Sequence, residues 1–313
     1  MEPDPDSPPR HRWHGHLWTI VPTVRDLVRP PRAPRIRPVT IAVHDDRYGV
    51  VTLGADLRGG DDDRDLVVVV HGLGGNRRSG SVLRATAALH RRGFATLALD
   101  LRGADRRGGG FYHVGLTEDL HAACAAPALA RFERLFVLGL SMGGHVALRF
   151  AAEPGCARLR GVAALCTPLD LQAAQRYHDE DTNGFYRRHV LTRLKAIYRG
   201  VARRHPVPTP LAEVLRCQTF REWDRLAIAR RFGYPDPESF YAAFSARRTL
   251  PDLRVPARLV LAAADPVAPP RLALPWVDAA PAGMLTVDVR ARGGHLYFPD
   301  DVVDPVAAAW LRR

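Results

Sequence analysis

Short apolar runs alternate with amphipathic segments along the chain from residue 38 onward. Residues 66–70 are apolar without interruption, which is typical of a strand buried on both faces of a parallel sheet. Residues 81–91 carry apolar side chains at helical spacing and predict a helix. The alternation continues as strand 95–99, helix 117–130, strand 135–140, helix 142–152 and strand 162–166. This order predicts an α/β fold with a mostly parallel, doubly wound sheet.

Further elements are predicted on both sides of this core. Residues 39–43 and 50–53 form a predicted strand pair, and the rhythm returns with strands 257–262 and 285–289 and a closing helix over 302–313. Between about 170 and 250 the pattern is helical, and this stretch holds 11 of the 24 aromatic residues. We therefore predict one α/β domain made of residues 36–169 and 251–313, a helical cap inserted at 170–250, and an irregular segment at 1–35. Within that segment, residues 16–22 are apolar enough to pack against the domain.

A serine flanked by glycines follows the predicted strand 135–140. The sequence Gly139-Leu140-Ser141-Met142-Gly143 lies between that strand and a strongly helical segment. This is the context of the Gly-x-Ser-x-Gly nucleophile elbow of the α/β-hydrolase fold, in which small residues let strand and helix approach closely. We predict that Ser141 is a nucleophile. An ordinary glycine-rich turn is the structural alternative.

A serine hydroxyl needs a base to take up its proton, and this fold supplies the triad in the order Ser, acid, His. His295 follows the last predicted strand in Gly293-Gly294-His295, where a glycine loop can carry its ring over the serine. The other histidines after Ser141 lie on the helix behind it or in the cap: His145, His178, His189 and His205. We predict that His295 is the general base, so activity should fall in acid as its ring takes up a proton.

Two aspartates compete for the role of the acid that orients this histidine. Asp265 follows the predicted strand 257–262 in a proline-rich loop, and Asp170 follows the strand 162–166. Some hydrolases take the acid from the earlier strand. We predict Asp265 for this role and keep Asp170 as its rival.

The oxyanion of an acyl-transfer intermediate requires two backbone N–H donors. Met142 directly follows the nucleophile, and the loop His71-Gly72-Leu73-Gly74-Gly75 follows the strand 66–70. We predict the N–H groups of Leu73 and Met142 as the donors. A phosphate-binding loop is the alternative for residues 71–75, but this segment lacks the Lys-Ser/Thr of a P-loop.

The formal charge of the chain is +12, and Lys195 is the only lysine among 45 basic residues. Such a charge attracts anionic partners, including nucleic acid and membrane surfaces. The arginines are scattered along the chain rather than gathered in one stripe, so we predict no nucleic-acid partner and favour a compositional bias. Peripheral contact with a membrane stays open, as does the oligomeric state.

The cysteines are Cys124, Cys156, Cys166 and Cys217, and none are in CxxC spacing. We expect all four to be reduced, buried residues, and we expect no metal site. No apolar run reaches the roughly 18 residues needed to span a bilayer, and the first ten residues lack the features of a signal peptide. We therefore expect a soluble, cytoplasmic protein.

These motifs together resemble those of the YheT-type α/β hydrolases, which also include related medium-chain acyl esterases, over most of the chain. Residues 16–22 are similar to the family's N-terminal His-Leu-x-Thr-x-x-Pro, and residues 112–119 to its Tyr-His-x-Gly-x-Thr-Glu-Asp signature. The oxyanion loop, elbow, acid and histidine match as well. The chain departs from the family at residues 102–105, and it carries one aspartate in the acid loop where the family usually has two. Without the family, Tyr112 and His113 would be loop residues and Thr117 a helix start.

The resemblance implies a serine hydrolase of carboxylic esters with short to medium acyl chains, working through an acyl-enzyme with no cofactor. Two other functions are kept as alternatives: acyl transfer to an alcohol on the same triad, and a non-enzymatic protein that docks on an anionic membrane. We expect the aromatic residues of the cap to form the acyl pocket. The plain alternative is that they pack the cap helices together.

Overall fold

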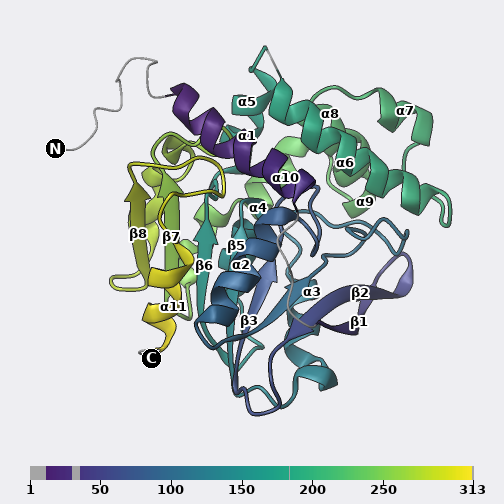
Figure 1. Ribbon diagram of the computed structural model, residues 1–313. Helices are drawn as coiled ribbons and strands as arrows, with labels where there is room; N and C mark the ends of the chain where they lie inside the picture. Colours follow the sequence, from purple (N-terminus) through teal and green to yellow (C-terminus); the bar gives the residue numbers. More distant parts are fainter. Residues whose placement is uncertain (1–11, 30–35, 183, 312–313) are drawn as a thin grey trace.

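The computed structural model of the protein describes residues 12–29, 36–182 and 184–311. Its described strands form one eight-stranded sheet in the order β1-β2-β4-β3-β5-β6-β7-β8 (Figure 1). The β1–β2 and β2–β4 pairs are antiparallel and all other neighbours are parallel. The strands are β1 (Arg37–Asp45), β2 (Gly49–Arg58), β3 (Asp65–Val70), β4 (Ala95–Leu99), β5 (Arg134–Leu140), β6 (Leu159–Leu165), β7 (Ala257–Ala262) and β8 (Leu285–Arg290). The predicted, mostly parallel α/β sheet is confirmed.

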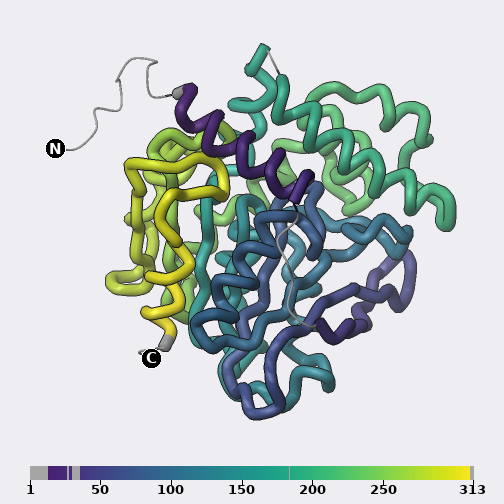
Figure 2. Tube along the Cα trace, viewed as in Figure 1, coloured from purple at the N-terminus to yellow at the C-terminus, as the bar shows by residue number. Residues whose placement is uncertain are grey.

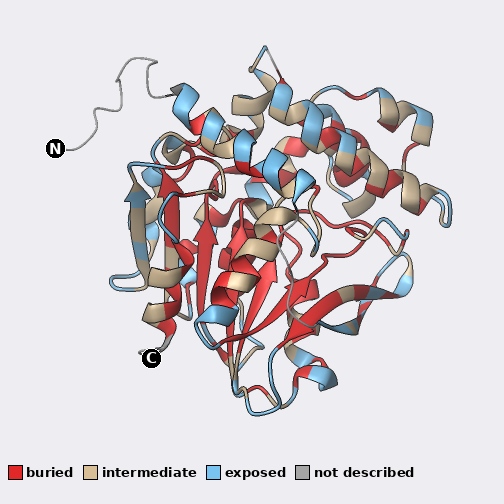
Figure 3. Ribbon diagram, viewed as in Figure 1, coloured by how far each residue is buried: buried red, intermediate tan, exposed pale blue. Residues whose placement is uncertain are grey.

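Helices cover both faces of this sheet. They are α2 (Gly80–Arg91), α3 (Glu118–Ala125), α4 (Met142–Ala152) and α11 (Val303–Leu311). Val67 and Val69 of β3 pack in the apolar cluster that includes α2 and α11, whereas Val68 and Val70 pack in the cluster that includes α3 and α4. Successive strand residues point to opposite faces, so an uninterrupted apolar run is what a sheet covered on both sides requires. Figure 3 shows the central strands buried throughout.

The cap lies between β6 and β7, which are neighbours in the sheet. Its helices are α5 (Leu171–Asp179), α6 (Phe185–Ala202), α7 (Leu211–Arg216), α8 (Phe220–Trp223), α9 (Arg230–Phe232) and α10 (Pro237–Phe244), with a π-helical turn at Asp224–Ala229. Aromatic rings pack between these helices, as in the pair Tyr198 of α6 and Trp223 of α8. The tube in Figure 2 shows the cap beside one end of the sheet, above the ends of the central strands.

The expectation of an irregular segment at residues 1–35 is wrong for residues 12–28. They form the helix α1 (Arg12–Val28), which crosses over the sheet domain next to the cap (Figure 1). Pro22 lies within this helix and is buried. Proline and a high content of His and Arg concealed the helical spacing, since proline disfavours helix interiors. Residues 1–11 and 30–35 lie outside the described part of the chain.

The predicted helix 117–130 ends early. It stops at Ala125, and the residue before Pro127 is extended, with a φ of −62° and a ψ of 126°. Because proline disfavours helical geometry in the residue that precedes it, the chain continues as a separate short turn, Pro127–Leu129.

The expectation of four reduced cysteines is wrong for one pair. Cys124, at the end of α3, forms a disulfide with Cys156, just before β6, while Cys166 and Cys217 are free and buried. The partners are 32 residues apart and are brought together only by the tertiary fold, so their spacing carried no signal. Among the described helices, none combines the length and apolarity needed to cross a bilayer.

Candidate active site

Ser141 lies in a strained turn between β5 and α4. Its φ of 54° and ψ of −124° fall outside the regions that most residues adopt, at a cost of about 1–3 kcal/mol. A Cβ on Gly139 would collide with the backbone of α4, and one on Gly143 would lie 2.5 Å from the carbonyl oxygen of His71. Both positions therefore require glycine. The sequence pattern thus reflects a close crossing of strand and helix that brings Ser141 to the carboxyl end of β5.

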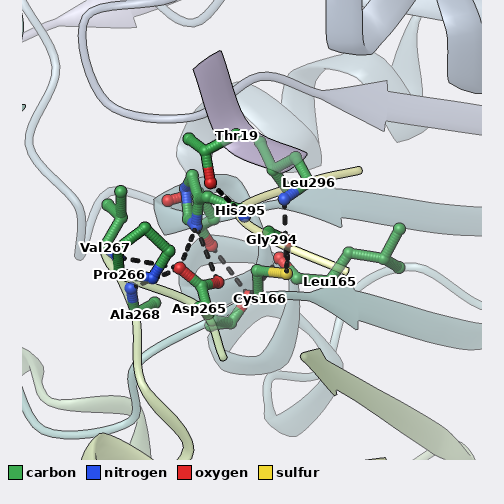
Figure 4. A network of polar contacts seen from close by, with 12 residues as sticks. Thr19, Leu165, Cys166, Asp265, Pro266, Val267, Ala268, Gly294, His295 and Leu296 are labelled. Atoms are coloured by element: carbon green, nitrogen blue, oxygen red, sulfur yellow. Dashed lines mark hydrogen bonds and ion pairs between the residues drawn. The ribbon is translucent and has the colours of Figure 1, made fainter. Parts of the chain in front are cut away.

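Asp265 and His295 follow neighbouring parallel strands and are hydrogen-bonded to each other (Figure 4). The Nδ1 atom of His295 lies 2.9 Å from Oδ2 and 3.2 Å from Oδ1 of Asp265. The carboxylate also accepts the backbone N–H groups of Val267 and Ala268, at 2.8 and 2.9 Å. Burial works to raise the pKa of Asp265, but His295 and these N–H groups outweigh it and hold that pKa below its ordinary value. An ionised acid that binds Nδ1 leaves Nε2 of the ring for proton transfer.

The rival acid, Asp170, is engaged elsewhere. It caps α5, where its Oδ1 accepts the N–H of Ala173 at 3.1 Å, and its Oδ2 forms an ion pair with Arg247 at 3.1 Å. Ala173 belongs to the cap helix α5, and Arg247 belongs to the segment that leads from the cap back to β7. The structure therefore brings Asp265 to His295 and leaves Asp170 as an anchor of the cap.

Ser141 lies near this pair, although among the described residues no hydrogen bond joins its hydroxyl to His295. The N–H of Ser141 binds the carbonyl oxygen of Leu165 at 2.8 Å, and Leu165 directly precedes Cys166. The Cys166 sulfur, a carboxylate oxygen of Asp265 and a ring nitrogen of His295 lie within 4.8 Å of one another. In hydrolases without substrate, the bond between serine and histidine is often long and tightens only when substrate binds.

Cys166, Asp265 and His295 also form the one group of potential metal ligands found among the described residues. Burial raises the pKa of the Cys166 thiol well above its ordinary value, which disfavours the thiolate that metal ligation requires. The hydrogen bond between Asp265 and His295 already uses the other two groups. This arrangement suits a proton-transfer pair better than a metal centre.

Two of the other histidines that follow Ser141 have pKa values lowered by burial. His145 lies inside the protein, with ring nitrogens 3.0 Å from the carbonyl oxygen of Pro168 and 2.8 Å from that of Phe244, and burial lowers its pKa to about 4. His178 is the cap histidine beside the acid loop. Burial, followed by the nearby His295, lowers its pKa to about 4 as well.

The predicted oxyanion loop lies against Ser141. A Cβ on Gly72 would lie 3.2 Å from that of Ser141, and the loop is a tight turn in which Gly75 N–H binds the Gly72 oxygen at 2.9 Å. Leu73 lies inside this turn, and no described group accepts its N–H. Met142 is the first residue of α4, so its N–H has no partner within the helix. Neither N–H group has an acceptor among the described residues, and their role as oxyanion donors stays a prediction.

Two side chains that the sequence left without a site role hold this loop. The Tyr112 hydroxyl accepts the N–H of Gly74 at 2.7 Å. The ring of His71 contacts the Gly72 oxygen at 2.8 Å through Nδ1 and accepts the N–H of Leu101 at 3.2 Å through Nε2. Tyr112 was visible only as part of the 112–119 signature, and its role requires the fold.

The rest of that signature is structural. The Asp119 carboxylate accepts a hydrogen bond from Nε of Arg102 at 2.8 Å, and Arg102 in turn reaches Asp45 of β1 at 3.0 Å. Thr117 does precede α3, as expected, but its hydroxyl donates to Glu153 at 2.7 Å instead of capping the helix. These bonds fix the loop from which Tyr112 extends.

The N-terminal helix α1 is also part of the site. The Thr19 hydroxyl accepts the backbone N–H of His295 at 2.8 Å (Figure 4) and donates to the Gly15 oxygen at 2.7 Å. A Cβ on Gly15 would collide with the backbone of Ala264, next to Asp265. His16 contacts the Tyr186 hydroxyl at 2.7 Å. The His-Leu-x-Thr-x-x-Pro motif at residues 16–22 therefore marks a segment that contacts the site.

Most aromatic residues of the cap pack against one another. Phe232, Phe240 and Phe244 surround His113, with ring centroids 4.4–5.2 Å away. Tyr177 is an exception, because its hydroxyl reaches the carbonyl oxygen of Pro266 in the acid loop at 3.0 Å. The packing interpretation of the cap aromatics is therefore favoured over that of an acyl pocket for the cluster around His113.

The chain is similar to known α/β hydrolases. The α/β-hydrolase family described as serine aminopeptidase, S33, matches residues 61–301. The chain is 27% identical over 244 residues to "Putative esterase YheT" of Escherichia coli, covering 74% of this chain and 70% of that protein. It is 22% identical over 293 residues to a monoacylglycerol lipase of Saccharomyces cerevisiae, covering 89% and 65%. The yeast medium-chain fatty acid ethyl ester synthase/esterase 2 is 24% identical over 306 residues, covering 87% and 64%. The chain thus spans about two thirds of the length of these relatives.

Solved structures share the fold. An esterase of Pyrococcus furiosus superimposes with a TM-score of 0.60 at 17% identity, covering 89% of this chain and 92% of that one. Proline iminopeptidase of Mycobacterium smegmatis gives 0.55 at 19% identity, covering 88% and 98%. One of these proteins is named as an esterase and the other as a peptidase, so the structural similarity concerns the fold alone.

Proposed function

The chain belongs to the α/β-hydrolase family described as serine aminopeptidase, S33, as a hydrolase of the YheT type, and we propose that it is a serine esterase for short- to medium-chain acyl esters. The observation that carries the proposal is the hydrogen bond between Asp265 and His295. It lies at the carboxyl ends of the strands, where the strained Ser141 also lies. The relatives named as esterases and lipases support carboxylic esters as the substrate class.

The proposed reaction is a two-step acyl transfer. His295 takes the proton of the Ser141 hydroxyl as its oxygen attacks the ester carbonyl, and Asp265 stabilises the charged ring. The N–H groups of Leu73 and Met142 bind the oxyanion of the tetrahedral intermediate. His295 then gives its proton to the leaving alcohol, which leaves an acyl-enzyme. Water repeats the sequence and releases the carboxylic acid and the free serine.

Transfer of the acyl group to an alcohol is a second candidate on the same residues. It is favoured by the similarity to a yeast protein named as both an ethyl ester synthase and an esterase. In this reaction an alcohol replaces water in the second step and loses its proton to His295. Product analysis with ethanol present separates the two, because transfer yields an ethyl ester and hydrolysis yields the acid.

The test is turnover of p-nitrophenyl esters from acetate to palmitate by the wild-type protein and by Ser141→Ala. We expect the wild type to turn over the short and medium esters and the variant to lose about 10⁴-fold or more in kcat. Equal activity of the two proteins would show that Ser141 is not the nucleophile. Inactivity of the wild type on the whole series, with an intact circular dichroism spectrum, would refute the proposed substrate class.

A further inference from the structure

The helix α1 exposes most of its apolar side chains on its outer side, whereas Trp18 stacks on Tyr297. Six of its residues, exposed by 37–75%, form what we call the α1 stripe: Trp13, Leu17, Ile20, Val21, Val24 and Val28. Their spacing of three or four residues places them on one side of the helix. The opposite side, with Gly15, Thr19 and Pro22, faces the protein. A surface helix of a globular protein ordinarily has the reverse orientation, with its apolar side against the core.

Positive charge borders the α1 stripe. Arg25 and Arg29 are exposed, and Asp26, the acidic residue of α1, forms an ion pair with Arg84 of α2, with only 10% of its side chain exposed. The helix therefore presents apolar and basic groups to solvent, without an exposed carboxylate between residues 13 and 29. The start of α6 extends this surface. Phe185 there is 54% exposed, and the next residue, Tyr186, contacts His16 of α1.

We propose that the α1 stripe is a docking surface for an anionic lipid bilayer. An apolar helix face bordered by arginine, with a tryptophan at one end, suits a helix lying in the plane of the membrane interface. The basic residues complement anionic headgroups, and the net charge of +12 opposes pairing with a second copy of the chain. Thr19, on the inner side of the same helix, holds His295, so the bound surface lies over the site. This surface goes beyond the esterase activity and can be tested without turnover.

The first test is sedimentation of the full chain with vesicles of phosphatidylcholine, with and without phosphatidylglycerol. The stripe variant is Leu17→Ser/Val21→Ser/Val24→Ser. Its matched control is Val50→Ser, which alters a residue 73% exposed in β2, away from α1. We expect the wild type and the control to bind the anionic vesicles and the stripe variant to bind at least about tenfold more weakly. Circular dichroism establishes that all three are folded. Equal binding by the stripe variant and the wild type would overturn the proposal.

A second test addresses charge. Arg25→Gln/Arg29→Gln should weaken binding to anionic vesicles by about fivefold per arginine, and added salt should do the same to the wild type. Arg254→Gln is the control, because Arg254 is exposed just before β7, at the sheet edge opposite the site. Sedimentation velocity without vesicles tests whether the α1 stripe instead binds a second copy of the chain. If the wild type is a dimer, the stripe variant is a monomer and neither binds vesicles, the partner of the α1 stripe is a second copy of the chain and the bilayer proposal is overturned.

Discussion

Two regions hold their side chains by different means: the loops at the carboxyl ends of the strands, which we call the carboxyl edge of the sheet, and the cap above them. At the edge, each site residue lies within five residues of the end of a strand, and backbone hydrogen bonds shape the loops that follow. Asp265 N–H binds the Ala262 oxygen at 3.1 Å, and Gly294 N–H binds the Tyr297 oxygen at 2.9 Å. Parallel strands in register therefore set the position of the reacting groups, as a rigid scaffold does for many catalytic loops.

The cap is held by side chains instead. Aromatic rings of the cap pack against one another edge to face, and a few polar anchors tie the cap to the sheet domain. Arg231 of α9 binds both the carboxylate of Asp45 and the face of Tyr48. Side-chain packing of this kind tolerates exchange of one apolar residue for another of similar volume far better than strand register tolerates a shift. The difference indicates that strand register places the proposed reacting groups, while the side-chain packing of the cap can accommodate changes of shape.

The two competing aspartates give the largest expected contrast between these regions. Asp265→Asn should lower kcat by about 10⁴-fold, because an amide cannot stabilise the charged ring of His295 and favours the wrong tautomer. Asp170→Asn should leave kcat within a few-fold, since this residue caps α5 and pairs with Arg247. Steady-state kinetics on a p-nitrophenyl ester measures both. If Asp170→Asn lowered kcat as much as Asp265→Asn, Asp265 could not be singled out as the acid that orients His295.

Next in size is the ionic anchor between cap and sheet domain. Arg231→Gln leaves the buried Asp45 with one cation fewer and should cost about 3–5 kcal/mol in the free energy of unfolding. Urea denaturation provides the measurement. The matched control is Arg221→Gln, which breaks an exposed ion pair with Glu238 inside the cap and should change little. Comparable losses in the two variants would mean that the cap is not anchored through Arg231.

How far the sequence predicts this protein follows the same division. The strands 95–99 and 257–262 and the helix 142–152 were predicted to the residue, because apolar runs and glycines are local signals. The identities of Ser141, Asp265 and His295 rest on position after a strand, which is also local. The bond between Thr19 and His295 joins residues 276 positions apart, so no spacing could reveal it. The family motif at residues 16–22 marked the segment without giving its contact.

A partly buried acid in the cap, Asp224, gives the third prediction. Burial raises the pKa of Asp224 to about 7, although the hydrogen bond from Tyr241, at 2.6 Å, works against that rise. An aspartate of the unfolded chain titrates near pH 4, so the folded state holds the proton more tightly between about pH 4 and 7. Stability should therefore fall as pH rises through this window, by up to about 1.4 kcal/mol per pH unit.

Asp224→Asn should remove this fall. Urea denaturation at pH 5, 6, 7 and 8 should show the variant gaining on the wild type up to about pH 7 and holding a constant advantage above it. Tyr241→Phe should shift the window upward, because it removes the hydrogen bond that lowers the Asp224 pKa. Parallel stability curves for Asp224→Asn and the wild type would show that the acid is ionised in the folded cap.

The smallest expected effect compares two tyrosine hydroxyls, one serving the edge and one serving the cap. The Tyr112 hydroxyl accepts the N–H of Gly74 beside the oxyanion loop, whereas the Tyr198 hydroxyl binds the oxygen of Thr209 at 2.7 Å inside the cap. Tyr112→Phe frees Gly74 and lets the Leu73 N–H drift from the oxyanion, so kcat should fall about tenfold with little change in KM. Tyr198→Phe should lower the free energy of unfolding by about 1 kcal/mol and leave kcat unchanged. A merely structural Tyr112 would instead give the second pattern, with stability lost and kcat retained, and the oxyanion loop would then be set by its glycines and His71 alone.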